Sequence, residues 1–116
     1  MTDRELLEMA AKAAGIPIDR SETNGGGVGN DGFGLTGDLM LDWHNDIRWN
    51  PLRDDGDALR LAVKLRIDIE WDEQTAGRTV EAYQRGEESC FCATEAEADY
   101  RRAIVRAAAA IGEAMP

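Results

Sequence analysis

Apolar residues near the start of the chain recur at the spacing of one helical face: Leu6, Leu7, Met9, Ala10 and Ala13. Thr2 and Glu5, just before this run, have the form of a capping box. The threonine hydroxyl accepts from the Glu5 N–H, and the glutamate side chain reaches back to the Thr2 N–H. Gly15 is suited to end the helix, and Pro17 prevents it from resuming. The pattern therefore predicts a helix over residues 2–14.

The same spacing predicts two further helices. The acidic residues at 54–57 form a helix start, because carboxylates cap free N–H groups and favour the positive end of the helix dipole. The apolar residues that follow them reach Leu65. Near the C-terminus, residues 94–97 have the form of a second capping box, and an alanine-rich apolar face follows. We expect this last helix to run from about Glu95 to Ala114.

Alternating apolar and polar residues indicate strands with one buried face. The alternating segments are residues 39–43, 47–49, 67–71, 79–83 and 89–92. Strands that follow one another along the chain favour antiparallel pairing over a doubly wound parallel sheet. We therefore predict an α+β fold, in which N-terminal, central and C-terminal helices pack on an antiparallel sheet of about four to five strands. No repeat or domain boundary is visible, so residues 1–116 are expected to form a single domain.

Residues 19–37 depart from both patterns, because glycine dominates the middle of the segment and leaves little there to bury. A glycine-rich loop can cradle phosphate, since a backbone without Cβ approaches the anion closely. This run lacks the G-x-x-x-x-G-K-[ST] pattern, and no basic residue follows it closely. We therefore expect a flexible loop or a hairpin tip over residues 19–37.

Composition narrows the class of protein further. A chain of 116 residues with 43% apolar residues can bury one core. The formal net charge of −10 disfavours direct nucleic-acid binding, although a local basic pocket and mimicry of nucleic acid by the acidic surface both stay open. No run of about 18 apolar residues is present, and the polar N-terminus lacks the features of a signal peptide. We expect a cytoplasmic protein that does not span a membrane.

Candidate chemistry for an enzyme is sparse. The chain has two cysteines, Cys90 and Cys92, and one histidine, His44, without the paired spacing of a zinc site. No nucleophile motif surrounds a serine or cysteine. The carboxylates Asp54, Asp55 and Asp57 could hold Mg²⁺ or Ca²⁺, but carboxylates at a helix start are more often caps. We therefore predict a binding protein without a metal or other cofactor, and not an enzyme.

Four residues are the best candidates for binding. Trp49 offers a flat apolar surface, Asn50 a donor and an acceptor, and Arg102 and Arg106 share one helical face because they lie four residues apart. Guanidinium groups form bidentate hydrogen bonds with phosphate and stack on bases, so these four residues suit a nucleotide-like ligand. The alternative is that Trp49 is a core residue, Asn50 a turn residue, and the arginines pair with surface carboxylates. Arg101 points away from the other two arginines.

Several segments resemble small phage and prophage proteins of the phage ABA sandwich family, which pack helices on an antiparallel sheet. The resemblance covers residues 49–52 and 54–63, the helix at 2–14 and the tail at 100–108. Its distinctive part is the Asn50-Pro51 turn followed by the Asp-Ala start of a helix. The layout is also similar to that of the Thoeris anti-defence sponge proteins of phages, which sequester cyclic ADP-ribose-type signals without catalysis.

The resemblance implies a phage accessory protein that acts in the host cytoplasm. It would sequester a small nucleotide-type ligand or a host defence component, with Asn50 contacting the ligand and Arg106 clamping a base or phosphate. A homodimer or higher oligomer is expected, because a domain this small rarely encloses a ligand alone. The alternative function is an acidic protein-interaction inhibitor that mimics nucleic acid and binds a host enzyme.

Overall fold

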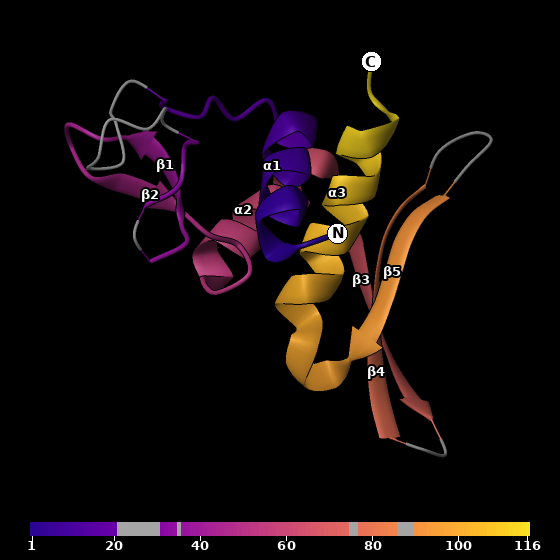
Figure 1. Ribbon diagram of the computed structural model, residues 1–116. Helices are drawn as coiled ribbons and strands as arrows, with labels where there is room; N and C mark the ends of the chain where they lie inside the picture. The colour runs from indigo at the N-terminus through magenta and orange to yellow at the C-terminus, as the bar shows by residue number, and fades with distance from the viewer. Residues whose placement is uncertain (21–30, 35, 75–76, 86–89) are drawn as a thin grey trace.

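The α+β class predicted from the sequence is confirmed by a computed structural model, which describes residues 1–20, 31–34, 36–74, 77–85 and 90–116. Figure 1 shows the elements in chain order, which are α1 (Asp3–Ala14), β1 (Leu39–Asp42), β2 (Ile47–Trp49), α2 (Asp55–Leu65), β3 (Asp68–Gln74), β4 (Gly77–Arg85), β5 (Cys90–Ala96), a 3₁₀ turn (Glu97–Asp99) and α3 (Tyr100–Ala114). None of the described helices has the length and apolar character that crossing a membrane requires.

The five strands in the described part of the chain form two separate antiparallel sheets rather than the one that we predicted. β1 pairs with β2, and β3, β4 and β5 form a three-stranded sheet in that order. The three helices lie between the two sheets, and α3 lies directly against β4 and β5 (Figure 1). The two sheets are separate because α2 follows β2 in the chain and crosses the helical layer before β3 begins.

The predicted starts of α1 and α2 are confirmed by their caps. The Thr2 hydroxyl accepts from the Glu5 N–H at 3.2 Å, and the Glu5 carboxylate accepts from the Thr2 N–H at the same distance, which completes the capping box. Asp54 caps α2 by accepting from the Asp57 N–H at 2.7 Å. Gly15 ends α1 in the left-handed conformation, as its position predicts.

The predicted start of the last helix is wrong. Thr94 and Glu95 belong to β5, where they pair with Glu81 and Val80 of β4, and α3 begins only at Tyr100. The residues at 94–97 match a capping box in type and spacing, but the sheet satisfies their backbone groups first. Pairing with a neighbouring strand has overridden a local helix signal.

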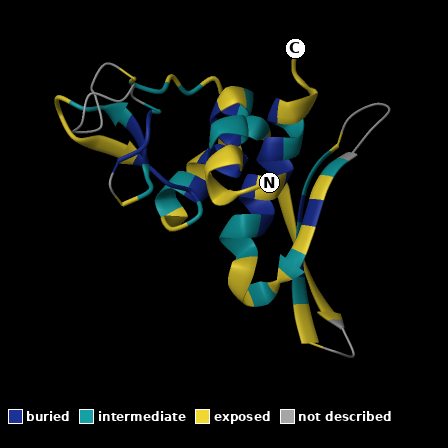
Figure 2. Cartoon of the chain, in the orientation of Figure 1, coloured by how far each residue is buried: buried dark blue, intermediate teal, exposed yellow. Residues whose placement is uncertain are grey.

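One hydrophobic core runs through the helical layer and reaches both sheets (Figure 2). It includes Trp49 at the end of β2 and Val80 in the middle of β4. Phe33, inside the segment that we expected to be a flexible loop, is buried in the same core and bridges to Leu39. The described ends of that segment therefore belong to the fold, while residues 21–30 and 35, on which the rest of the prediction falls, lie outside the described residues.

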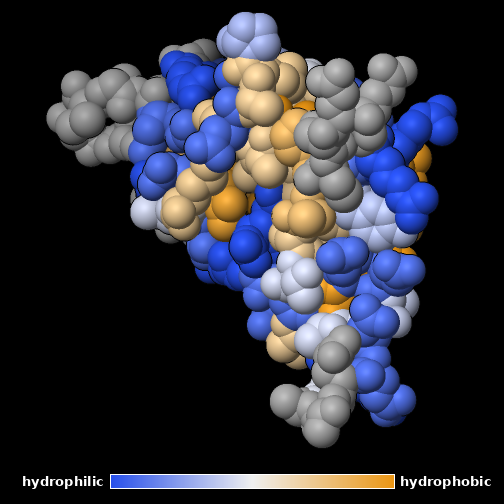
Figure 3. Space-filling view, turned by 90° about the vertical axis from the view of Figure 1, so that its right-hand side faces the viewer, coloured by the Kyte–Doolittle hydropathy of each residue, from blue (hydrophilic) through white to orange (hydrophobic). Residues whose placement is uncertain are grey.

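The three-stranded sheet has one covered and one uncovered face. Side chains alternate between the faces along each strand, and Val80, Ala82 and Ala93 point toward α3 and are buried. The opposite face carries Asp68, Glu70, Asp72, Glu81, Tyr83, Cys92 and Thr94. No described element covers it, and Figure 3 shows this side of the molecule, with hydrophilic side chains over its lower and right-hand parts.

Helices α1 and α3 approach each other so closely that only glycine fits at one point. A Cβ atom on Gly112 would lie 1.9 Å from the backbone oxygen of Met9 and 2.8 Å from its carbonyl carbon. Alanines continue the contact along α3, and Ala103, Ala107 and Ala108 are fully buried. The interface between the two helices is therefore set by backbone contact rather than by interdigitating large side chains.

We expect Gly112→Ala to lower the free energy of unfolding by about 1–3 kcal/mol, because α1 must move away from α3 to admit the methyl group. Urea denaturation followed by circular dichroism measures the change. Gly56→Ala is the matched control, since a Cβ there meets only side-chain atoms of Arg60 and Asp54, at 3.2 Å, and no backbone atom. That variant should be neutral or more stable by up to about 1 kcal/mol. Equal destabilisation by both substitutions would contradict the close-approach argument.

Candidate functional site

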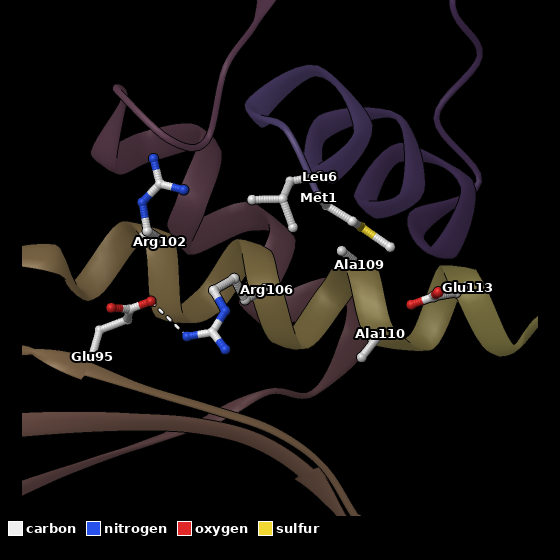
Figure 4. A pocket seen from close by; sticks show the side chains of 8 residues that line it. All are labelled: Met1, Leu6, Glu95, Arg102, Arg106, Ala109, Ala110 and Glu113. Carbon is white, nitrogen blue, oxygen red and sulfur yellow. Dashed lines mark hydrogen bonds and ion pairs between the residues drawn. The ribbon is translucent and has the colours of Figure 1, made fainter.

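A groove lined by two of the predicted binding residues runs along the surface of α3, between the start of α1 and the end of β5. It encloses about 420 Å³, within the range of roughly 300–1,000 Å³ that is usual for small-molecule sites. Figure 4 shows its lining residues, which are Met1, Leu6, Glu95, Arg102, Arg106, Ala109, Ala110 and Glu113. The groove therefore combines an apolar floor with charged side chains of both signs.

Two arginines flank the groove and are each held by a neighbouring element. Arg106 donates to the Glu95 carboxylate at 2.6 Å and to the Thr94 carbonyl at 3.4 Å, both in β5. Arg102 donates to the Asp3 carboxylate of α1 at 3.0 Å. Figure 4 shows the two guanidinium groups on opposite sides of α3, with Arg106 pointing toward Glu95. Both arginines line the groove, but their guanidinium groups point in different directions, one toward α1 and the other toward β5.

The electrostatic balance of the groove is close to neutral. The charges of Arg102 and Arg106 are matched by those of Glu95 and Glu113 within the lining. The arginine side chains remain 38% and 44% exposed, so solvent screens both ion pairs and each contributes about 0–1 kcal/mol. An anion that offers two or more oxygens can therefore compete with the carboxylates for the guanidinium groups.

Trp49 and Asn50 lie elsewhere, so the four predicted residues are not assembled into one pocket. Trp49 is only 5% exposed and packs in the core, which leaves no free ring face for a stacked base. Asn50 is 7% exposed and lies beside β2 and the start of α2, in a polar hollow that it shares with Asp38, Arg48, Arg53, Asp54 and Asp57. These positions match the alternative of a core tryptophan and a turn asparagine.

Asn50 holds the turn before α2 together through a complete set of hydrogen bonds. Its amide donates to Asp38 at 2.7 Å, its side-chain oxygen accepts from the Leu52 N–H at 3.1 Å, and its backbone N–H donates to Asp57 at 2.9 Å. Partial burial raises the pKa of Asp38, but the hydrogen bonds from Asn50 and Thr36 and the charges of the nearby arginines lower it more. The net pKa of Asp38 is below its ordinary value, which keeps the carboxylate ionised as the acceptor for Asn50.

The three aspartates at the start of α2 each have a separate structural partner. Asp54 is the N-cap, Asp57 accepts from Asn50 and Arg60, and Asp55 accepts from the Tyr100 hydroxyl and from Arg101, both at 2.6 Å. The hydrogen bonds from Tyr100 and Arg101 lower the pKa of Asp55. Among the residues with a described placement, no group of three or more histidine, cysteine or acidic side chains has the arrangement of a metal site.

The groove also contains residues that sequence reasoning missed. Ala109 and Glu113 follow Arg102 and Arg106 at helical spacing, so the periodicity of α3 could have placed all four residues on one face. Leu6 comes from α1 and Glu95 from β5, and no local pattern links either residue to α3. Glu95 was expected inside a helix, and this error concealed its role as the partner of Arg106.

Replacing Asn50 with alanine should destabilise the fold by about 1–3 kcal/mol, because the Leu52 N–H and the Asp38 carboxylate lose their partner in a buried position. The free energy of unfolding from urea denaturation tests this. Asn45→Ala removes a comparable side-chain bond, to Asp42 at 2.7 Å, but in an exposed turn. Its effect should stay within about 0.5 kcal/mol, and a larger loss than that of Asn50→Ala would refute the structural role of Asn50.

Stability should fall at acidic pH through Asp38 and Asp55. Their pKa values in the folded protein are below the ordinary value, which is about 3.9, so both groups stabilise the fold above that pH. The contribution disappears as the pH falls through the folded pKa values. Asp55→Asn should therefore lose less unfolding free energy than the wild type between about pH 5 and pH 3. Asp68→Asn, which removes the same charge from a carboxylate without a described partner, is the matched control.

Comparison with known proteins yields no relative for this chain. No protein-family model, no curated protein and no solved structure matches it. The resemblance of the α1, α2 and α3 segments to phage proteins therefore stays a prediction, and the case for a binding site depends on the geometry of the residues themselves.

Proposed function

We propose that the protein is a non-catalytic binding protein whose groove along α3 takes a small anionic ligand of the nucleotide type. The observation that carries the proposal is the presence of Arg102 and Arg106 in one groove with an apolar floor. Met1, which is 58% exposed and lines the groove, provides an apolar surface for a base or sugar, and the two guanidinium groups provide donors for phosphate oxygens. Trp49 and Asn50, which we expected to share this task, have no part in it.

The energetic requirement for binding is small. A phosphate must displace Glu95 from Arg106 and Asp3 from Arg102, and the carboxylates then return to water. Each exposed ion pair contributes about 0–1 kcal/mol, so little free energy is lost when the carboxylates return to water. Two new charge-assisted contacts therefore offset the two that are lost. Glu95 is also placed to accept from an N–H group of a bound base.

Sequestration is the mode of action that we propose. The ligand would be held without a bond being broken, and the free concentration of the ligand would fall. This role follows from the resemblance of three segments to phage accessory proteins and from the lack of a nucleophile motif in the sequence. Since the arginines of the groove are partly exposed to solvent, a second copy that covers it belongs to the same proposal.

Isothermal titration with AMP, cyclic AMP and ADP-ribose tests the proposal, and the ligand is recovered afterwards to check that it is unchanged. Arg106→Ala should weaken the binding of an interacting nucleotide by about tenfold or more, because a charge-assisted contact to phosphate is lost. Arg106→Lys should retain part of the affinity, since it keeps the charge but not the two-pronged geometry.

Arg60→Ala is the matched control, because Arg60 is also an exposed helical arginine that pairs with a carboxylate, but it lies on α2 outside the groove. It changes the net charge equally and should leave affinity within about twofold of the wild type. The proposal is refuted if no nucleotide binds, or if Arg106→Ala folds and binds as the wild type does.

A further inference from the structure

The free edge of β3 has properties that the groove along α3 does not explain. β3 is the last strand of its sheet, paired with β4 on one side only. Every residue from Asp68 to Glu73 is exposed. Within the described part of the chain, no backbone hydrogen bond outside the sheet reaches this strand. Alternate residues of β3 therefore direct their N–H and C=O groups toward solvent, as a template for a further strand.

One face of this edge is apolar. Ile69 and Trp71 point toward the same side as α3 but lie beyond its cover, and they are 36% and 57% exposed. The Trp71 ring lies 6.5 Å from the ring of Tyr100, at a tilt of 55°. These two rings line a shallow hollow with Glu97 and Ala98. Exposed aromatic surface next to an open strand edge is typical of protein–protein contacts.

The other face of the same edge is acidic. Asp68, Glu70 and Asp72 alternate with the apolar residues, and none of the three has an ion pair or hydrogen bond with a described residue. Glu70 lies directly opposite Glu81 of β4, and like charges in this arrangement destabilise a sheet. A cation placed beside Glu70 would relieve this repulsion.

A second copy of the chain is a poor occupant for this edge. Antiparallel pairing of two β3 strands would bring Asp68, Glu70 and Asp72 of one copy against the same residues of the other. The like charges would lie in cross-strand positions on one face. Natural sheets use charged edge strands in this way to prevent self-association. The occupant must therefore be a segment of opposite charge.

We propose that β3 binds an extended segment of a protein partner in which basic and apolar residues alternate. The segment adds a fourth strand to the sheet beside β3, as in other cases of strand addition. Its lysines or arginines lie opposite the carboxylates of Asp68, Glu70 and Asp72, and its apolar residues contact Ile69 and Trp71. The formal net charge of −10 attracts such a segment at long range. The site shares no lining residue with the groove along α3, so it is independent of nucleotide binding.

A labelled peptide with the sequence Lys-Val-Lys-Val-Lys-Val-Lys is the direct probe, measured by fluorescence anisotropy at about 50 mM salt so that screening stays modest. The control peptide has the same composition but places all its lysines before its valines, so it keeps the charge and loses the alternation. We expect the alternating peptide to bind at least about tenfold more tightly. Hydrogen exchange of the β3 amides should slow only with the alternating peptide.

Glu70→Lys should weaken binding of the alternating peptide by about tenfold, because an attraction becomes a repulsion. The variant should fold, because the substitution replaces the Glu70–Glu81 repulsion with an attraction. Circular dichroism is the measurement that checks its fold. Glu8→Lys makes the same charge change on α1 and should weaken binding by less than about threefold. Trp71→Ser tests the apolar face and should also weaken binding.

Three results would overturn the proposal. Equal affinity for both peptides would mean that charge alone attracts them and that no strand is added. Equal weakening by Glu8→Lys and Glu70→Lys would show that β3 is not the site. A wild-type dimer in sedimentation experiments that becomes monomeric on substitution of Trp71 would identify a second copy as the occupant.

Discussion

The close packing of α3 against its neighbours is the constraint on which the rest of the structure depends. This helix is contacted by α1, α2 and the sheet, and five of its seven buried positions are alanine or glycine, the other two being Ile104 and Val105. Large side chains there would separate the layers, and a Cβ at Gly112 would collide with the backbone of α1. Small residues shorten every distance across the helical layer, so the positions of both α1 and the sheet are set by α3.

The same constraint decides where the charges of α3 lie. Because much of α3 is buried, its arginines lie at the borders between α3 and the elements that pack against it. Arg101 donates to α2 and the turn before it, Arg102 to α1, and Arg106 to β5. Each arginine therefore links α3 to a different element. The groove is a consequence of this arrangement, because it runs along α3 between α1 and β5, the elements that hold Arg102 and Arg106.

Local signals predicted α1 and α2, because a cap and a periodic apolar face are contained in a short stretch of sequence, and α1 also has a stop at Gly15. The beginning of α3 was not predictable in this way, since residues 94–97 carry a helix signal that pairing with β4 overrides. Distance along the chain explains the errors at the site. The sequence offered a core tryptophan and a turn asparagine as one of two alternatives. It could not decide between them, because Asn50 is bonded to Asp38 and Trp49 packs in a core built from distant elements.

The strong negative charge of the chain affects the two proposed sites in opposite ways. A free nucleotide is repelled at long range, so its binding must depend on short contacts with Arg102 and Arg106 inside the groove. A basic segment is attracted at long range and is then selected at β3 by backbone pairing and by Ile69 and Trp71. At the groove along α3, salt therefore weakens both the long-range repulsion of a nucleotide and its contacts with the two arginines. At the edge of β3, salt weakens only the attraction of the basic segment. The two proposed sites therefore differ in how their binding depends on charge and salt, although both belong to the same acidic protein.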